Sequence, residues 1–514
     1  MLDPQASLYI ASTLLALFYT WRLIRQPKVR HPPSPRSLPF VGNLFSIPAG
    51  YEYIAFAKLG EELKSDIVYL EILGHKHVIL NSAEAASEVL EKRAAFNSSR
   101  PPIPMVKDSS LMNWSENFVL MEYSDLWKQY RRMMNNWLNV RAVTQFNDLQ
   151  ERQAYSFLKR LLNHTKHDQP FEHVKNELYF SMGSLMFQLP YGYKPENPQD
   201  KFLKDIQLTL RNLVSAGMQT NFLVNLFPAM RYTPDWFPGT GWKVTGREYG
   251  AEKEKAKSGP YEWVKTQVAS GTNQNSILGS LLRDHPLLSG LSTAEKDERL
   301  KEIGITIFGA GTDTTTAFLV NLVFAMVANS DVQAKAQQEL DADIGRAVLP
   351  RIADKERLPY IKNLIDEVFR LYPVLPFGEE TIGEALDENT FHCNSWRAII
   401  SAIGRDPRHY EDPEVFDPDR FLDPGVLRPP MFGWGRRKCP GIHFAEDSTF
   451  IMAASLLSFF TFSQKRDTSG HKVLPQAEPE RNSLVFELKP FDFELEPRSE
   501  EHRQLVLSTS TDGE

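Results

Sequence analysis

One of the two cysteines of this chain lies in a short loop whose neighbours could support metal chemistry. The loop reads Phe432-Gly-Trp-Gly-Arg-Arg-Lys-Cys-Pro-Gly441 and places Cys439 among glycines and cations. A thiolate binds metal strongly and needs nearby positive charge or N–H donors to stay ionised. Gly435 and Gly441 permit tight turns and close approach to a flat partner, and Arg437 can pair with a carboxylate in a forked geometry. The loop therefore predicts a socket for a sulfur-ligated haem whose acidic edge is held by arginine.

The spacing Phe-x-x-Gly-x-Arg-x-Cys-x-Gly resembles the haem-binding signature of the cytochrome P-450 monooxygenases at every fixed position. The resemblance makes Cys439 the axial ligand of haem b, with Phe432, Gly435, Arg437 and Gly441 around the cofactor. The alternative is a basic loop that happens to hold a buried cysteine. His443 is a rival ligand by position, but we expect it on the following helix as an ordinary polar neighbour.

A long helix is expected over residues 301–329, with Ala310-Gly-Thr-Asp-Thr-Thr315 in its middle. Glycine, aspartate and threonine are poor occupants of a helix interior, and threonine hydroxyls compete for carbonyls of the preceding turn. The resemblance makes Asp313 and Thr314 the acid–alcohol pair that relays protons during oxygen activation. It also implies that Ala310 and Gly311 leave space beside the iron. Without the cysteine loop, this segment would be interpreted as a core helix.

The resemblance also implies roles for two further sets of residues. Glu367 and Arg370 lie three residues apart on one helix face, which alone indicates only a surface ion pair. With Arg420 they reproduce the family's Glu-x-x-Arg and Pro-x-Arg-Phe elements, which form a buried structural network behind the haem. Trp127 and Arg131 lie one helical turn apart, and the resemblance assigns both to a haem propionate, together with Arg437.

Composition restricts the class of protein. The chain of 514 residues has a net charge of −7, which argues against nucleic-acid binding. Its two cysteines, Cys393 and Cys439, exclude a disulfide framework and fit a reducing compartment.

The N-terminus has the features of a membrane anchor. Residues 4–21 carry no formal charge, and five basic residues follow by residue 36. This is the lower limit for a spanning helix, and the charge bias places the body of the protein in the cytosol. A cleaved signal peptide would need a basic n-region and a small-residue cleavage site, and neither is visible. We therefore expect a single-pass protein of the endoplasmic reticulum membrane, in which the sequons at Asn97, Asn113 and Asn163 are unused.

Four regions follow from these patterns: an anchor (1–25), a basic, proline-rich hinge (26–45), a haem-thiolate monooxygenase domain (46–498) and a polar tail (499–514). Within the domain, residues 66–82 predict two strands joined near Gly74. Helical periodicity covers 83–93, 142–162 and 199–216, among others. Alternating apolar residues over 483–496 predict a late β-hairpin. The fold class is mainly α with small β regions, consistent with the cytochrome P-450 fold: a helical bundle around haem, a long central helix and small sheets.

Residues 225–242 and 377–398 need separate interpretations. The first stretch places Tyr232, Trp236 and Phe237 among prolines, which predicts a loop. It packs on the core, or it forms a lip over the substrate entrance that dips into the bilayer, and we favour the lip.

Residues 377–398 depart from the family pattern, which has a Pro-His-Arg-like strand and an Ile-Pro-x-Gly turn here. Real divergence and a gene-model error both explain this departure.

The resemblance implies a haem-thiolate monooxygenase that inserts one oxygen atom of O2 into an apolar small molecule. Electrons would come from NADPH through cytochrome P-450 reductase, with cytochrome b5 as a second donor, because the chain carries no flavin or nucleotide fingerprint. The likeness is greatest to fungal members of secondary metabolism or xenobiotic oxidation. Two alternatives stay open: a haem-thiolate isomerase or dehydratase that needs no O2 activation, and a catalytically impaired haem-binding paralogue. The substrate cannot be predicted, because substrate contacts come from scattered loops.

Overall fold

The computed structural model describes most of the chain that follows the predicted anchor. It covers Thr13 and residues 31–165, 167–218, 221–272, 276–283, 285–378, 381–382, 395–467 and 469–509. The anchor, apart from Thr13, and the first part of the hinge therefore lie outside the described residues.

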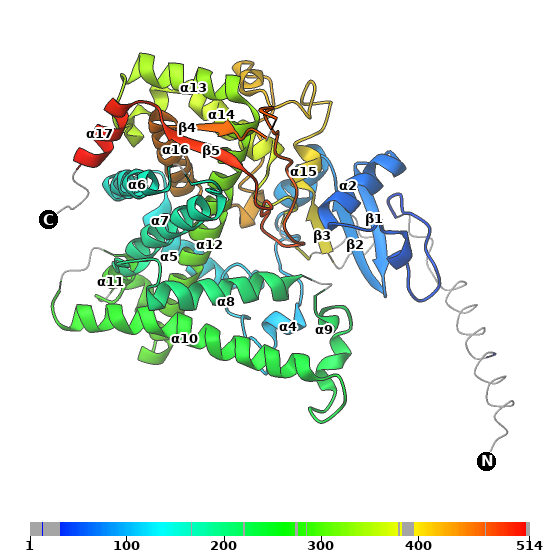
Figure 1. Ribbon diagram of the computed structural model, residues 1–514. Helices are drawn as coiled ribbons and strands as arrows, with labels where there is room; N and C mark the ends of the chain where they lie inside the picture. Colours follow the sequence, from blue (N-terminus) through cyan, green and yellow to red (C-terminus); the bar gives the residue numbers. More distant parts are fainter. Residues whose placement is uncertain are drawn as a thin grey trace.

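Helices make up most of the described chain, and two small sheets complete it (Figure 1). The helices are α2 (Glu52–Leu63), α3 (Ala83–Ala86), α4 (Pro104–Lys107), α5 (Asp125–Leu138), α6 (Asn147–Leu161), α7 (Phe171–Tyr191), α8 (Lys201–Gly217), α9 (Leu223–Leu226), α10 (Gly241–Ala269), α11 (Ile277–Leu281), α12 (Thr293–Ala328), α13 (Ser330–Asp343), α14 (Pro359–Leu371), α15 (Ile400–Ile403), α16 (Ile442–Phe459) and α17 (Glu500–Ser508). The strands are β1 (Ile67–Ile72), β2 (His75–Leu80), β3 (Ser395–Ala398), β4 (Phe460–Gln464) and β5 (Phe493–Pro497).

The long helix α12 runs through the centre of the helical body and packs against α7, α10, α14 and α16. It begins at Thr293, earlier than the expected residue 301, because Ser292 and Glu295 form a capping box. Among the described residues it is the one helix long and apolar enough to cross a bilayer, yet 78% of its apolar window is buried inside the protein. Helix α12 is therefore the core helix that positions the site.

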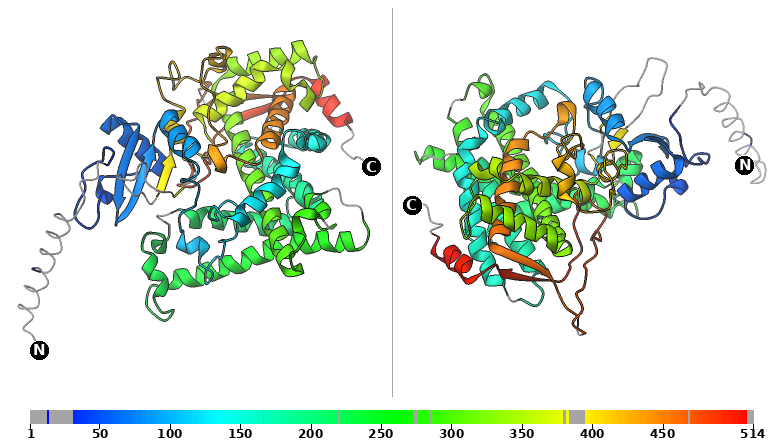
Figure 2. Two further views of the ribbon diagram at one scale, coloured as in Figure 1. Left: turned by 180° about the vertical axis from the view of Figure 1, so that it is seen from behind. Right: turned by 90° about the horizontal axis from the view of Figure 1, so that it is seen from above.

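A three-stranded sheet lies with α2 at one side of the helical body, as the views in Figure 2 agree. Strands β1 and β2 pair antiparallel, with Ile72 opposite His75, as predicted. Leu73 and Gly74 both have positive φ in the connecting turn, which suits the right-handed twist of a hairpin. Strand β3 then adds parallel to β2 from more than 300 residues further along the chain.

The late hairpin is confirmed only in part: Pro479 and Leu488 form an antiparallel bridge, but the strand that ends the stretch pairs elsewhere. The alternating side chains from Phe486 to Leu495 are buried as expected. However, β5 pairs antiparallel with β4, from Phe460 opposite Pro497 to Gln464 opposite Phe493. The partner strand therefore follows α16 directly and is not a neighbour within residues 483–496.

The atypical stretch 377–398 is described only in part, because residues 379–380 and 383–394 lie outside the described residues. Thr381 exchanges two backbone hydrogen bonds with Trp396, at 3.0 and 2.7 Å, and Ile382 donates its N–H to the Ser99 carbonyl. Backbone at 381–382 thus joins β3 to the segment that precedes α4, near the cysteine loop.

Candidate active site

The cysteine loop is held in shape by its own backbone and by a close neighbour. The Cys439 N–H donates to the Phe432 carbonyl at 3.0 Å, which closes the loop around a 3-10 turn at Gly435–Arg437. Gly435 has φ +58°, and a Cβ there would lie 2.2 Å from the Leu90 carbonyl oxygen. At Gly441 the nearest atom to an added Cβ is the Cys439 sulfur, 4.0 Å away. Gly435 is therefore required by the protein fold, whereas Gly441 keeps the space beside the sulfur clear.

Aromatic rings connect this loop to the central helix. Phe432 lies 6.2 Å from Phe369 of α14, and Phe369 stacks on Phe318 of α12 at 4.3 Å between ring centroids. The loop is thus tied to α14 and, through it, to α12.

Helix α5 brings Trp127 and Arg131 to the cysteine loop. The Arg131 guanidinium donates to the Lys438 carbonyl at 2.5 Å. Burial lowers the pKa of Arg131, and the charge of Cys439 acts in the opposite direction, so the two side chains are electrostatic neighbours. Trp127 is buried, and among the described residues its indole N–H has no hydrogen-bond partner. Such an orphaned buried donor indicates an acceptor that the polypeptide does not supply.

Arg437 projects toward the same place. It donates to three backbone carbonyls, at 2.7 Å to Ser98, 3.4 Å to Phe118 and 2.7 Å to Met121. Its guanidinium also lies 4.7 Å from the Trp127 ring centroid. The cysteine loop, α5 and the segment from Ser98 to Met121 therefore meet at one point.

Two further cations in that segment were not predicted from the sequence. Arg100 is 7% exposed and donates to the Val119 carbonyl at 3.0 Å. Lys107 donates to the Pro101 carbonyl at 2.8 Å. The pKa of Lys107 is lowered to about 8, chiefly by burial, with the charge of Glu122 raising it and the charges of Arg100 and Arg437 lowering it. Several cations held close together are complementary to an anion.

Helix α12 presents a stripe of accessible residues in the middle of a buried helix. Ala310 is exposed, although Phe308 and Thr312 on either side of it are buried. Thr314 lies one turn further on the same face, and its hydroxyl donates to the Ala310 carbonyl at 2.5 Å. Gly311 faces elsewhere, since an added Cβ would lie 2.1 Å from the Met186 sulfur of α7. Gly311 therefore allows α12 and α7 to pack closely, and Ala310 and Thr314 form the accessible stripe.

Asp313 has an unusual electrostatic environment between α12, α7 and the segment before β5. The pKa of Asp313 is raised to about 7, chiefly by burial and next by the charge of Glu487, with the charge of Arg481 acting in the opposite direction. Tyr179 of α7 is close enough that the Asp313 charge raises its pKa too, after burial as the main cause. The Tyr179 hydroxyl has no hydrogen-bond partner among the described residues. This arrangement favours an acid that is protonated near neutral pH.

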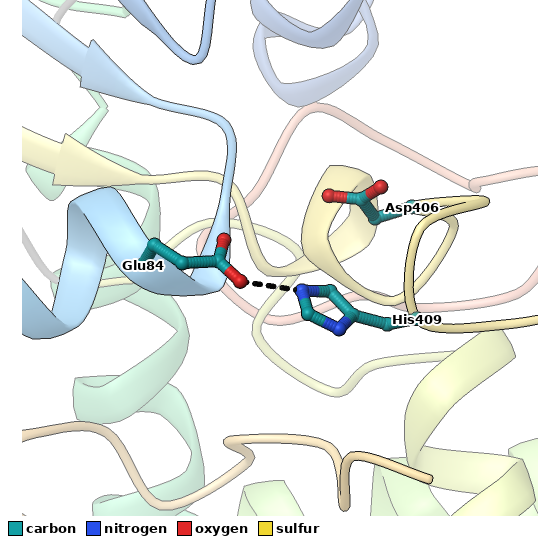
Figure 3. A group of neighbouring side chains, drawn as sticks. All are labelled: Glu84, Asp406 and His409. Atoms are coloured by element: carbon teal, nitrogen blue, oxygen red, sulfur yellow. Dashed lines mark hydrogen bonds and ion pairs between the residues drawn. The ribbon is translucent and has the colours of Figure 1, made fainter.

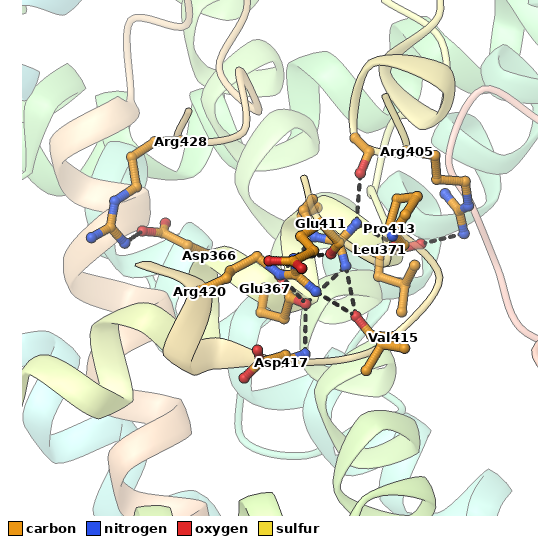
Figure 4. A network of polar contacts seen from close by, with 12 residues as sticks. Asp366, Glu367, Leu371, Arg405, Glu411, Pro413, Val415, Asp417, Arg420 and Arg428 are labelled. Atoms are coloured by element: carbon orange, nitrogen blue, oxygen red, sulfur yellow. Dashed lines mark hydrogen bonds and ion pairs between the residues drawn. The ribbon is translucent and has the colours of Figure 1, made fainter. Parts of the chain in front are cut away.

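Glu367, Arg370 and Arg420 form one buried network (Figure 4). The Arg370 guanidinium donates to both oxygens of the Glu367 carboxylate, from Nε at 2.7 Å and from Nη2 at 2.8 Å, and both side chains are 0% exposed. Arg420 donates to the same carboxylate at 3.1 Å, and the Asp417 N–H donates to it at 2.7 Å. The remaining Arg370 N–H groups bond the carbonyls of Gly404, Pro413 and Val415. The network therefore fixes the chain that leads from α14 toward the cysteine loop.

The residues that would contact a haem at this site have the chemistry that a haem requires. A half-buried thiol lies beside arginine, glycine keeps the space next to the sulfur clear, and an orphaned indole donor lies among buried and half-buried cations. The cations and the Trp127 N–H suit the haem propionates, and Cys439 suits the iron. His443 is the second residue of α16, 3.6 Å from Glu446, in the role of polar neighbour that we expected. The fold and site together define a haem-thiolate protein.

Comparison with known proteins gives the family. The sequence profile of cytochrome P-450 matches residues 32–494. The chain is 30% identical to cytochrome P-450 monooxygenase COX2 of Coprinopsis cinerea, over 94% of this chain and 92% of the relative. It is 32% identical to cytochrome P-450 monooxygenase 98 of Postia placenta, over 93% and 92%. The chain belongs to the cytochrome P-450 family, whose members hold a cysteine-ligated haem, and its curated relatives are fungal monooxygenases, that is, oxidoreductases.

Solved structures support the fold. A zebra fish cytochrome P-450 with progesterone matches with a TM-score of 0.69 at 20% identity, covering 88% of this chain and 100% of that chain. A structure of a zebra fish cytochrome P-450 with abiraterone gives 0.68 at 19% identity, covering 87% and 100%. The predicted fold class, mainly helical with small sheets, is thus confirmed.

Proposed function

We propose that this protein is a membrane-anchored haem-thiolate monooxygenase that inserts one oxygen atom from O2 into an apolar small organic molecule. The observation that carries the proposal is the pairing of two features: the cysteine loop with its cations, and the accessible stripe of Ala310 and Thr314 beside the half-buried acid Asp313. A haem bound through Cys439 would supply the activation of O2, with the second oxygen atom leaving as water.

The protein's own residues would then hold the cofactor and manage protons. Arg131 and the Trp127 indole N–H would bind a propionate, with Arg437 and Arg100 supplying positive charge nearby. Asp313 would hold a proton near neutral pH, and the Thr314 hydroxyl would pass it into the accessible stripe. An isomerase or dehydratase has no need of such an acid–alcohol pair, so the raised pKa of Asp313 favours oxygen chemistry.

Electron transfer would use a cationic surface next to the cysteine loop. Lys128, Arg132, Arg436 and Lys438 are exposed. The cationic groups of Lys128 and Arg436 lie 5.3 and 5.0 Å from the Tyr123 ring centroid, so α5 and the cysteine loop share this patch. An acidic partner would be steered toward it. We assign the patch to NADPH–cytochrome P-450 reductase, with cytochrome b5 as a second donor.

Membrane attachment would involve the loop before α10 as well as the predicted N-terminal anchor. Tyr232, Trp236 and Phe237 are 74%, 80% and 51% exposed, as expected for a lip and not for a loop packed on the core. Aromatic side chains of this kind prefer the membrane–water interface. The proposed location is the endoplasmic reticulum membrane, with the catalytic domain in the cytosol.

The first test is the absorption spectrum of the reduced, CO-bound protein, with Cys439→Ser as the control. Sulfur ligation shifts the Soret band to long wavelength in the wild-type protein, and the serine variant should lose this shift. A wild-type spectrum without the shift would refute the proposal.

The second test separates oxygenase from isomerase. The protein is reconstituted with reductase and NADPH and supplied with a panel of apolar small molecules under 18O2. Label in a product supports the monooxygenase. Steady NADPH consumption without labelled product would indicate an impaired paralogue, and conversion of an added organic peroxide without NADPH would indicate the isomerase.

A further inference from the structure

Three histidines lie close together at the connection between α6 and α7. His164 ends a 3-10 turn (Leu162–His164) after α6, His167 lies in the connection, and His173 is in the first turn of α7. The ring centroids are 5.7 Å apart for His164 and His167, 5.0 Å for His164 and His173, and 4.4 Å for His167 and His173. No role in the proposed oxygenase reaction uses these side chains.

His164 is oriented by a neighbouring ion pair. Its Nε2 lies 3.3 Å from the Glu177 carboxylate, which also accepts from Arg160 at 2.8 Å. In the tautomer that donates from Nε2, the Nδ1 atom carries a lone pair. That atom is buried and has no hydrogen-bond partner among the described residues. A carboxylate that fixes one imidazole nitrogen and leaves the other as a lone-pair donor is the usual support of a metal-ligating histidine.

The three ring centroids lie at about the spacing that a shared metal ion requires, but as the rings are placed their nitrogens do not all lie within 4.8 Å of one another, so binding requires the rings of His167 and His173 to turn. Nitrogens about 2.0–2.1 Å from a tetrahedral ion hold their ring centroids about 5 Å apart. The three measured separations lie on both sides of this value. His167 and His173 are exposed, so their rings can turn without disturbing the core, and a ring flip exchanges nitrogen and carbon positions without moving the centroid. Three imidazoles suit divalent ions such as Zn²⁺, Cu²⁺ and Ni²⁺.

We propose that His164, His167 and His173 bind one divalent transition-metal ion, with water in the fourth position, and that the ion ties the end of α6 to the start of α7. The pair of Glu177 and Arg160 is neutral overall and does not oppose a cation. Helix α7 packs along α12, so the ion would brace the helix that carries Met186 and Tyr179.

A second cluster of possible ligands serves as the comparison. Glu84, which is exposed, lies close to the buried Asp406 and the half-buried His409 (Figure 3). His409 is 2.7 Å from Glu84, but Asp406 is already engaged by the Arg408 guanidinium at 2.5–3.0 Å. A guanidinium in this position repels a metal cation and occupies the carboxylate. We therefore expect no strong metal binding at this cluster.

The test uses the full-length holoprotein, purified through an affinity tag that contains no histidine. Isothermal titration with ZnCl2 in a non-chelating buffer should give one site with a Kd of about 10 µM or below. The double variant His167→Ala/His173→Ala should weaken this affinity by about tenfold or more, with an unchanged reduced CO spectrum as the check on folding. If that variant loses the CO spectrum, the single variant His167→Ala replaces it. His409→Ala should bind Zn²⁺ as the wild-type protein does.

A thermal melt gives an independent readout. Zn²⁺ should raise the unfolding temperature of the wild-type protein and of His409→Ala, but not that of the double variant. Absence of Zn²⁺ binding in the wild-type protein, binding that survives the double substitution, or binding that His409→Ala abolishes would each overturn the proposal. None of these outcomes bears on the monooxygenase assignment, which the CO spectrum tests separately.

Discussion

At the scale of single residues, Asp313 is an acid placed where ionisation is costly. Burial raises its pKa to about 7, whereas an aspartate in an unfolded chain has a pKa of about 3.9. Because the folded-state pKa is the higher one, the protonated form stabilises the fold. This contribution is complete below about pH 4 and is lost as the pH rises through about 7.

The first prediction follows from this loss of stability as the pH rises. Asp313→Asn keeps the size of the side chain but cannot ionise, so the unfolding temperature of the variant should depend less on pH between 5 and 8 than that of the wild-type protein. Thermal melts of the holoprotein at several pH values measure the difference. Equal pH dependence in the two proteins would mean that Asp313 has the same pKa in the folded and unfolded protein, which would contradict the prediction.

A substitution at Glu487 can shift the pKa of Asp313 while Asp313 itself stays unchanged. Its negative charge raises the pKa of Asp313, and it also pairs with Arg481, whose charge acts in the opposite direction. Glu487→Gln should therefore lower the pKa of Asp313, and product formation per NADPH should fall at a lower pH than in the wild-type protein. Glu480→Gln removes a neighbouring carboxylate that pairs with Lys175, and should leave the pH profile in place.

At the scale of elements, the cysteine loop depends on a close backbone contact. Gly435→Ala would combine a left-handed residue, at a cost of about 1–2 kcal/mol, with a Cβ 2.2 Å from the Leu90 carbonyl. We expect this variant to lose most of its bound haem and several degrees of unfolding temperature. Gly433→Ala is the matched control, because Gly433 has φ +71° and nothing within 4 Å of an added Cβ. Haem content and thermal melts of the two variants separate the steric contact from backbone strain.

The network at the end of α14 gives another matched pair of adjacent acids. Glu367 is 0% exposed between two arginines, whereas Asp366 is 23% exposed and pairs with Arg428, which is 49% exposed. Removing one partner of a fully buried ion pair costs about 3–5 kcal/mol, and a pair that reaches solvent contributes less. Glu367→Gln should therefore lower expression of folded holoprotein sharply, and Asp366→Asn should have a smaller effect. Denaturant unfolding followed by the CO spectrum measures both.

The sequence predicted those parts of the site whose chemistry is local or specific. Phe432, Cys439 and the Glu367 pair follow from spacing within one loop or one helical turn. Arg100 and Lys107 could not be predicted, because nothing in residues 99–107 indicates that folding places these two cations beside Arg437. The β4–β5 pairing is equally non-local, since alternation specifies which side chains are buried but not which strand lies opposite. The early start of α12 was predictable from the capping box of Ser292 and Glu295 and was missed.

At the scale of the whole molecule, charge is distributed unevenly. The chain carries a net charge of −7, yet Lys128, Arg132, Arg436 and Lys438 gather around the cysteine loop and α5. A cationic patch on an anionic protein orients an approaching acidic partner, because the rest of the surface repels it. This distribution favours one docking orientation, in which an acidic partner lies next to Cys439.

The last prediction tests that orientation. Arg436→Ala/Lys438→Ala should raise the KM for reductase several-fold and reduce the salt dependence of turnover, since two charges that attract the partner are removed. The reduced CO spectrum obtained with dithionite should not change, because chemical reduction needs no docking. Lys58→Ala is the control, since this lysine of α2 is exposed but belongs to the sheet region. If both variants change the KM equally, the attraction comes from overall charge and not from the patch; if neither does, the reductase binds elsewhere.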